Sequence, residues 1–256
     1  MARAKPFVIG GERVPLGQSK DVRLIISETY TGDKIRVPLR VIRAKKPGPT
    51  VFITAAIHGD EVNGTGIIHD FLFGDTVKLE SGTLVLAPVV NVFGFESHER
   101  YLPDRRDLNR SLRGSKKGSL DSRIAHTLMT ELVDNCDYGI DLHTAAFQRT
   151  NFPNIRADLS NASARRLAEA FGCIMVVDGK GPLGSFLREA TRRGCPTIIL
   201  EAGEPWKVEP SVLQIGIQGI RNVLSNLGMI SEPQLKKPTV ARTHRGVRAT
   251  ATIPPT

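Results

Sequence analysis

Three apolar runs in this chain are each followed at once by a short polar string that contains metal-binding side chains. The runs occupy residues 51–57, 138–140 and 197–200, and their composition is typical of buried β-strands. The strings that follow them are His58-Gly59-Asp60-Glu61, Asp141-Leu142-His143 and Glu201-Ala202-Gly203-Glu204. In an open α/β sheet, sites form just beyond the carboxyl ends of the strands. The pattern therefore predicts a sheet that gathers the three strings at one edge.

The donor set in these strings favours zinc. His58, Glu61 and His143 offer two imidazoles and one carboxylate, which bind catalytic zinc and leave a coordination position for water. Glu201 would then act as general base toward that water. Each string alone is a weak signal, because a single histidine or a lone His-x-x-Glu is more often structural. The prediction of one zinc ion per chain depends on the three strings together.

Two further side chains near these strings have less certain roles. Asp141 could orient a zinc-bound imidazole, or it could equally cap a nearby turn, and the sequence leaves both alternatives open. His69 lies close to the apolar stripe of an expected helix, which favours a structural role over a metal-binding one.

Composition limits the class of protein. The 256 residues are 40% hydrophobic and 24% charged, which is enough for the core of one large α/β domain. No apolar run approaches the length of a membrane span, and the first residues lack the apolar core of a signal peptide. The three cysteines, Cys136, Cys173 and Cys195, are widely spaced, which fits a reducing compartment. We therefore expect a cytoplasmic protein that does not insert into membranes.

Strands alternate with helices along most of the chain, which predicts a mixed, largely parallel, doubly wound sheet with helices on both faces. Further strands are expected over residues 22–26, 35–42 and 83–91. Helices are expected over residues 62–73, 122–135, 165–171, 183–193 and 212–227. Residues 45–49 and 92–117 are expected to be loops, and the length of the second suggests a functional role.

The long expected loop is rich in arginine. Asn109 and Arg110 place a carboxamide beside a guanidinium fork, an arrangement suited to gripping a substrate carboxylate. One of the preceding arginines could polarise the scissile carbonyl. We assign that catalytic role to Arg106 and a substrate-binding role to Arg100, whereas Arg105 is expected to be a surface residue.

Four motifs, in this order, resemble the succinylglutamate desuccinylase/aspartoacylase family, which is related to the zinc carboxypeptidases. They are His58-Gly59-Asp60-Glu61, Arg106-Asp107-Leu108-Asn109-Arg110, Asp141-Leu142-His143 and Glu201-Ala202-Gly203. The resemblance implies a zinc-carboxypeptidase-like fold with His58, Glu61 and His143 as zinc ligands. It also implies Asn109 and Arg110 as carboxylate binders and Glu201 as the base, in preference to the nearby Glu204.

The net charge of +9 is concentrated toward the C-terminus, where residues 236–256 contain five basic residues and no acidic one. Such a segment could bind nucleic acid, but its lack of interleaved aromatic residues favours an exposed, poorly ordered tail. Relatives commonly have a further C-terminal β domain, of which this segment could be a remnant. We expect residues 1–235 to form a single zinc-hydrolase domain that begins with strands within residues 1–45.

These features predict a zinc-dependent amidohydrolase that removes the acyl group from a small N-acyl amino acid or related amide. A metallocarboxypeptidase acting on short peptides is an alternative, because both enzymes use an arginine to bind a carboxylate. A non-catalytic protein that binds a ligand or nucleic acid is an alternative of another class. The complete set of ligand and base positions argues against it. The sequence is also compatible with a homo-oligomer.

Overall fold

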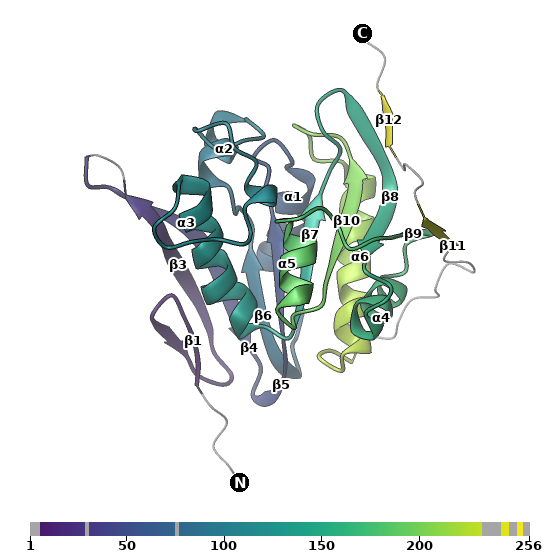
Figure 1. Cartoon of the computed structure of the whole chain (residues 1–256). Coiled ribbons are helices and arrows are strands. Elements are labelled where there is room, and N and C mark those ends of the chain that lie inside the picture. The colour runs from purple at the N-terminus through teal and green to yellow at the C-terminus, as the bar shows by residue number, and fades with distance from the viewer. Residues whose placement is uncertain (1–5, 29–30, 75–76, 232–241, 246–249, 253–256) are drawn as a thin grey trace.

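The computed structural model describes residues 6–28, 31–74 and 77–231, together with the backbone of residues 242–245 and 250–252 (Figure 1). The strands within these ranges are β1 (Phe7–Ile9), β2 (Glu12–Val14), β3 (Ser19–Glu28), β4 (Lys34–Arg43), β5 (Lys46–Ala55), β6 (Ser81–Ala87), β7 (Tyr138–His143), β8 (Arg149–Ala157), β9 (Met175–Asp178), β10 (Thr197–Gly203), β11 (Arg242–Arg245) and β12 (Thr250–Thr252). The α-helices are α1 (Asn63–Phe73), α2 (Val92–Ser97), α3 (Leu120–Thr127), α4 (Ala162–Phe171), α5 (Phe186–Arg192) and α6 (Pro210–Asn226).

Among the described residues, ten strands form one sheet in the order β11-β9-β8-β10-β7-β5-β6-β4-β3, with β12 paired beside β8. The four central strands β10, β7, β5 and β6 are parallel to one another, whereas β4 and β3 add an antiparallel edge beside β6. On the other side, β8 pairs antiparallel with β10 and parallel with β9. This arrangement confirms the predicted mixed, largely parallel sheet.

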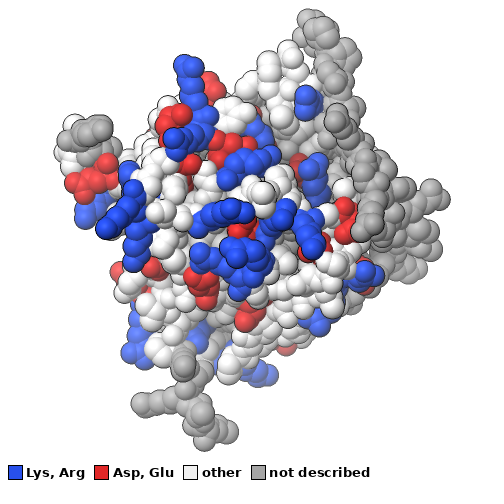
Figure 2. All heavy atoms as spheres, in the orientation of Figure 1, with Lys and Arg blue, Asp and Glu red and all other residues white. Residues whose placement is uncertain are grey.

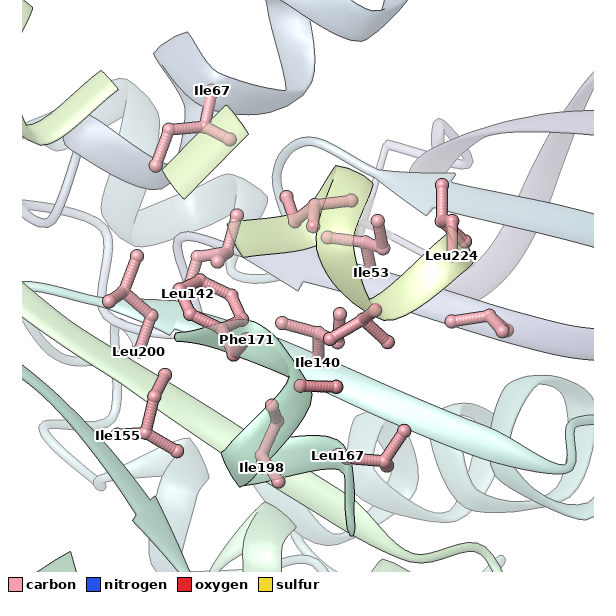
Figure 3. Close-up of a cluster of buried hydrophobic side chains, with 14 of the residues drawn as sticks. Ile53, Ile67, Ile140, Leu142, Ile155, Leu167, Phe171, Ile198, Leu200 and Leu224 are labelled. Atoms are coloured by element: carbon pink, nitrogen blue, oxygen red, sulfur yellow. The ribbon is translucent and has the colours of Figure 1, made fainter. Parts of the chain in front are cut away.

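Helices cover both faces of this sheet, so the central strands are apolar on both sides, as expected for buried parallel strands. On one face, α1, α4 and α6 pack over β5, β7 and β10. Figure 3 shows part of this core, in which Ile53, Ile140 and Leu200 of the strands lie near Phe171 of α4. On the other face, Phe52 of β5 packs edge-on against Phe186 of α5, with ring centroids 5.3 Å apart.

Helices α3 and α5 lie on the face of the sheet that is nearer the viewer in Figure 1. The predicted helix over residues 122–135 is α3 continued by a π-helical turn, Leu128–Leu132, and a 3-10 turn, Val133–Asn135. The four other predicted helices are also present, as α1, α4, α5 and α6, with ends shifted by up to three residues. None of the helices in the described ranges is both long and apolar enough to cross a membrane.

Two expected loops contain regular structure, and two strands were missed. Residues 46–49 are not a loop but the start of β5, where the register with β6 is irregular between Lys46 and Thr50. The expected loop 92–117 contains the short helix α2 and a 3-10 turn, Leu108–Arg110. Strands β8 and β9 were not predicted, because β8 is polar and β9 has only four residues.

The C-terminal segment is described only in part. The backbone of β11 pairs in parallel with β9, and that of β12 pairs antiparallel with β8. The remaining residues of the expected tail, 236–241, 246–249 and 253–256, lie outside the described residues.

Candidate metal centre and active site

Two neighbouring parallel strands bring the three predicted metal ligands together. His58 and Glu61 lie in the turn between β5 and α1, and His143 is the last residue of β7. All three side chains are buried, and one donor atom from each lies within 4.8 Å of the other two. His58 Nδ1 is 2.8 Å from Glu61 Oε1, and His143 Nδ1 is 2.9 Å from Glu61 Oε2. The two imidazoles therefore face the same carboxylate through the same type of ring nitrogen.

The opposite nitrogen of each imidazole lies against another carboxylate. His58 Nε2 is 3.1 Å from Asp107 Oδ1, and His143 Nε2 is 2.7 Å from Asp141 Oδ2. The other oxygen of Asp141 accepts a hydrogen bond of 2.7 Å from the Thr54 hydroxyl. Carboxylates that hold one imidazole nitrogen leave the other nitrogen free to bind a metal. Of the two alternatives for Asp141, its contacts favour the orientation of His143.

The charges around the two histidines favour a cation at this position. Burial lowers the pKa of His143, but the carboxylates of Asp141 and Glu61 outweigh it and raise this pKa well above its usual value. The pKa of His58 is also raised, because Glu61 and Asp107 outweigh the opposing effect of burial. Two imidazole nitrogens and one carboxylate, set in a field that favours positive charge, fit a catalytic zinc site.

Glu201 reaches the same site from the strand beside β7. In the parallel register of β10 and β7, Glu201 is the direct partner of His143. Asn151 Nδ2 donates a 2.6 Å hydrogen bond to Glu201 Oε2, and Arg156 Nε lies 3.6 Å from Oε1. Burial raises the pKa of the Glu201 carboxyl, while Arg156 and His143 oppose this rise. A buried carboxylate with a raised pKa is well suited to accept a proton near neutral pH.

A cavity of about 370 Å³ opens over these groups. Besides His58, Glu61, His143 and Glu201, its polar lining comprises Arg100, Asn109, Arg110, Thr144, Arg149, Asn151, Arg156 and Ser185. The Arg110 side chain is about half exposed, and its Nη1 donates to Asn109 O at 2.7 Å. Asn109 is buried, and its Oδ1 accepts a 2.8 Å hydrogen bond from Phe186 N at the start of α5. The predicted carboxylate-binding pair therefore lines the same cavity as the candidate metal ligands.

The sequence of residues 47–227 matches the succinylglutamate desuccinylase/aspartoacylase catalytic domain. The chain belongs to this family. A curated relative is the N-alpha-acetyl-L-2,4-diaminobutyric acid deacetylase of Halomonas elongata, which is 27% identical over 213 residues. The alignment covers 80% of this chain but only 61% of the deacetylase, so the chain spans less than two thirds of that relative's length.

Solved structures of family members are similar over almost the whole chain. A succinylglutamate desuccinylase/aspartoacylase from Rhodobacter sphaeroides is 28% identical, with a TM-score of 0.77 over 91% of this chain and 73% of that one. The product-bound ectoine utilisation protein EutE (DoeB) from Ruegeria pomeroyi is 25% identical, with a TM-score of 0.79 over 90% of this chain and 74% of that one. The fold is therefore that of the family, which is carboxypeptidase-like.

Arg100 and Arg106 have different positions relative to the cavity. Arg100 lines the cavity, where its Nη1 lies 2.6 Å from Glu61 Oε1 and its Nη2 lies 3.1 Å from His58 Nε2. Arg106 does not line the cavity; its half-exposed guanidinium donates to Ser119 and to Asp121. The geometry thus favours Arg100 over Arg106 as the arginine that contacts a substrate carbonyl.

Other residues considered from the sequence lie away from the cavity. Glu204 forms an ion pair of 2.8 Å with Lys207, and it does not line the cavity. His69 is exposed on α1, where its ring contacts that of Phe73. Arg105 is exposed in a loop, as expected of a surface residue.

Four residues near the site were not singled out as functional in the sequence analysis. Asp107 lies inside the family motif, so its contact with His58 could have been considered from the sequence. Asn151, Arg149 and Arg156 belong to β8, and no part of that strand was predicted. No periodic signal in the sequence marks this strand; in the structure Asn151 and Asn154 are buried, which is uncommon for asparagine.

Gly59 permits the turn that carries the candidate ligands His58 and Glu61 to approach α2 closely. Its backbone is not in the left-handed region, so the conformational freedom of glycine does not explain its presence here. A Cβ at Gly59 would instead lie 2.0 Å from the carbonyl carbon of Gly94 and 2.2 Å from Phe95 N. No other residue fits between this turn and α2 without displacing one of them.

Proposed function

We propose that this protein is a zinc-dependent hydrolase that removes the acyl group from a small N-acyl amino acid. The observation that supports this most directly is the placement of a His-Glu-His donor set, a buried glutamate and a carboxylate-binding pair around one cavity. The Halomonas relative is a deacetylase of an N-acetylated amino acid, which is consistent with this proposal.

In this proposal His58, Glu61 and His143 hold the zinc ion. When bound, zinc supplies Lewis acidity, which makes a water molecule more acidic and polarises a carbonyl oxygen. Asp107 and Asp141 fix the two imidazole rings through their Nε2 atoms, so that the Nδ1 atoms face the ion. Thr144 N also donates a 3.1 Å hydrogen bond to Glu61 Oε2, which holds that carboxylate in place.

The remaining side chains position the substrate and move the proton. Arg110 and Asn109 bind the carboxylate of the amino acid, and Arg100 donates to the carbonyl oxygen of the acyl group. Glu201 accepts a proton from the attacking water, whose oxygen bonds to the carbonyl carbon. The amide C–N bond then breaks, and Glu201 returns the proton to the leaving nitrogen. Asn151 keeps the Glu201 carboxylate directed toward this reaction throughout.

Two measurements on the purified protein test the proposal: its zinc content and its hydrolysis of a panel of N-acyl amino acids and dipeptides. We expect about one zinc per chain, and release of free amino acid from N-acetyl or N-succinyl amino acids that ceases when the metal is removed by chelation. Preferential cleavage of dipeptides would favour the metallocarboxypeptidase alternative instead. Absence of hydrolysis from zinc-loaded protein, with retention of nucleic acid on a filter at moderate salt, would favour a binding protein.

We further propose that residues 1–235 act as one catalytic domain. The metal ligands, Glu201 and the Arg110 pair all come from one sheet and its adjoining loops within this range. Residues 236–256 are assigned no catalytic role.

A further inference from the structure

Glu189 is a buried carboxylate on helix α5, outside the candidate metal centre. It is 1% exposed, although glutamate is rarely buried without partners. It does not line the cavity, and the proposed reaction gives it no part. A buried charge needs several partners to offset its loss of hydration. The groups that surround Glu189 therefore show which parts of the chain this carboxylate holds together.

Three donors reach the Glu189 carboxylate. Gly184 N, in the loop before α5, donates a 3.2 Å hydrogen bond to Oε1, and Arg113 Nε lies 3.5 Å from the same oxygen. Arg192 Nε donates to Oε2 at 3.0 Å. Burial raises the pKa of the Glu189 carboxyl, but these hydrogen bonds and charges outweigh it and lower the pKa below its ordinary value. Glu189 is therefore ionised at neutral pH, and it joins the loop of Gly184 to the segment that carries Arg113.

That segment, residues 108–113, also carries Arg110, and we call it the Arg110 segment. Its backbone lies directly against the loop before α5. Leu112 N donates a 2.9 Å hydrogen bond to Gly184 O. Gly184 has a φ of +76°, and a Cβ there would lie 2.0 Å from Arg110 O. Glu189 thus holds the amide of the residue on which the Arg110 backbone packs.

The position of the Arg110 side chain depends on how firmly this backbone is held. The side chain is about half exposed, and its Nη1 donates to the carbonyl of the preceding residue, Asn109, at 2.7 Å. Its ion pair with Asp107 is long, at 3.9 Å. Both partners belong to the same stretch of chain as Arg110 itself. If the Arg110 segment shifts, the guanidinium group moves with it.

The charges around α5 give Glu189 a second reason to matter. Figure 2 shows Lys and Arg gathered over the middle of the face on which α5 lies in Figure 1. The side chains of Arg113 and Arg192 are 65% and 67% exposed, and they approach Glu189 from the Arg110 segment and from α5. Like charges repel, so the anion between these two arginines offsets a force that would separate the segments.

We propose that Glu189 is a positioning residue of the candidate active site, which holds the Arg110 segment against the loop before α5 and so sets where Arg110 meets the substrate carboxylate. This inference rests on the proposed deacylase function and adds a residue that acts on the substrate only through Arg110. Loss of Glu189 should therefore change recognition of the carboxylate while leaving the metal ligands and Glu201 in place.

Kinetics on paired substrates test this role in the zinc-loaded full chain. The pair is the N-acetyl or N-succinyl amino acid that the wild type cleaves fastest and its C-terminal amide. Glu189→Ala should lower kcat/KM for the acid by about tenfold or more, because a small displacement of an orienting group costs at least that much, and should affect the amide far less. Glu189→Gln should lie between wild type and Glu189→Ala, because glutamine still accepts a hydrogen bond from Gly184 N but has no charge.

Further variants show whether Glu189 acts through Arg110. In an Arg110→Lys background, Glu189→Ala should no longer change the ratio of kcat/KM for acid and amide, because residues that act as a unit are not additive. Arg113→Gln should reproduce part of the effect, since it removes one link between the two segments. Glu169→Ala is the matched control, because it removes an exposed glutamate from α4, and it should keep the wild-type ratio.

Amide hydrogen exchange tests the contact between the two segments without catalysis. In Glu189→Ala, exchange should become about tenfold faster over the Arg110 segment and at Gly184, whose N–H loses its acceptor. Exchange in β5 and β7 should stay at the wild-type rate, because these strands lie beside the candidate metal ligands and not beside Glu189. Zinc content and Tm check that the variant is loaded and folded.

The outcomes separate this inference from the proposed function. A wild-type ratio of acid to amide in Glu189→Ala, or an equally large effect in the Arg110→Lys background, would overturn the positioning role and leave the deacylase proposal intact. A lower Tm with an unchanged ratio would assign Glu189 to stability alone and overturn it as well. No hydrolysis of any N-acyl substrate would contradict the proposed function. In that case, faster exchange over the Arg110 segment would still support the role of Glu189, and unchanged exchange would overturn it.

Discussion

Glu201 and His143 are direct partners in the parallel register of β10 and β7. Hydrogen bonding between adjacent strands holds their backbones about 4.8 Å apart, independently of any loop. The candidate base and one candidate metal ligand therefore take their separation from the hydrogen-bonded sheet itself. Sites built on sheet strands are more precise than sites built on loops, which suits a reaction that needs exact placement of water.

Loss of either candidate histidine should remove the metal. We expect His58→Ala and His143→Ala to reduce zinc from about one per chain to a small fraction. His69→Ala should keep its zinc, because His69 is an exposed histidine outside the site. Elemental analysis after dialysis measures the difference. Full zinc occupancy in the His58/His143 double variant would exclude the assigned ligand set.

Removal of the base should strongly reduce turnover without removing the metal. Glu201→Gln keeps the shape of the side chain but cannot accept a proton, so kcat should fall by about a hundredfold or more. Glu204→Gln is the control, since Glu204 is paired with Lys207 outside the cavity. If Glu204→Gln lost activity and Glu201→Gln kept it, Glu204 and not Glu201 would be the base.

The pH dependence of the wild type should report the raised pKa of Glu201. Only the ionised carboxylate accepts a proton, so kcat/KM should fall as the pH falls through this pKa, which burial places above its ordinary value. Arg156 opposes that rise, and Arg156→Gln should therefore move the acid limb to higher pH. A limb that stays in place in the variant would argue that another group controls it.

Arg110 is expected to bind the substrate carboxylate through paired hydrogen bonds. Arg110→Lys keeps the charge but loses the planar fork, so it should damage hydrolysis of carboxylate-bearing substrates more than that of their C-terminal amides. Both binding and turnover should suffer, because the amide is no longer oriented over the metal centre. The measurement is the ratio of kcat/KM for the acid and amide forms. Arg106→Lys, outside the cavity, should leave this ratio at its wild-type value.

Gly59→Ala should separate the metal-binding turn from α2. The added Cβ would meet the backbone of Gly94 and Phe95, so one of the two segments must move, and overpacking of this kind costs about 1–3 kcal/mol. We expect a lower Tm and weaker zinc binding. Gly179→Ala provides a comparison, because a Cβ there meets nothing within 4 Å. Wild-type zinc affinity in Gly59→Ala would show that the turn tolerates the displacement.

The sequence by itself determined the central strands, most helices and the proposed metal ligands. Apolar runs of strand length identify β5, β7 and β10, because parallel strands covered on both faces must be apolar throughout. The rule that sites form at the carboxyl ends of such strands then brings His58, His143 and Glu201 together, whatever the intervening segments do.

Only the tertiary structure decided which polar residues complete the site. Strand β8 lacks an apolar pattern, since its cavity-lining residues Arg149, Asn151 and Arg156 are polar, so local periodicity could not reveal it. The choice between Arg100 and Arg106 likewise depends on where a long, irregular segment folds back. Side-chain contacts between distant segments arise from packing, which leaves no periodic trace in a single sequence. The set of charged side chains that lines the cavity depends on the same packing.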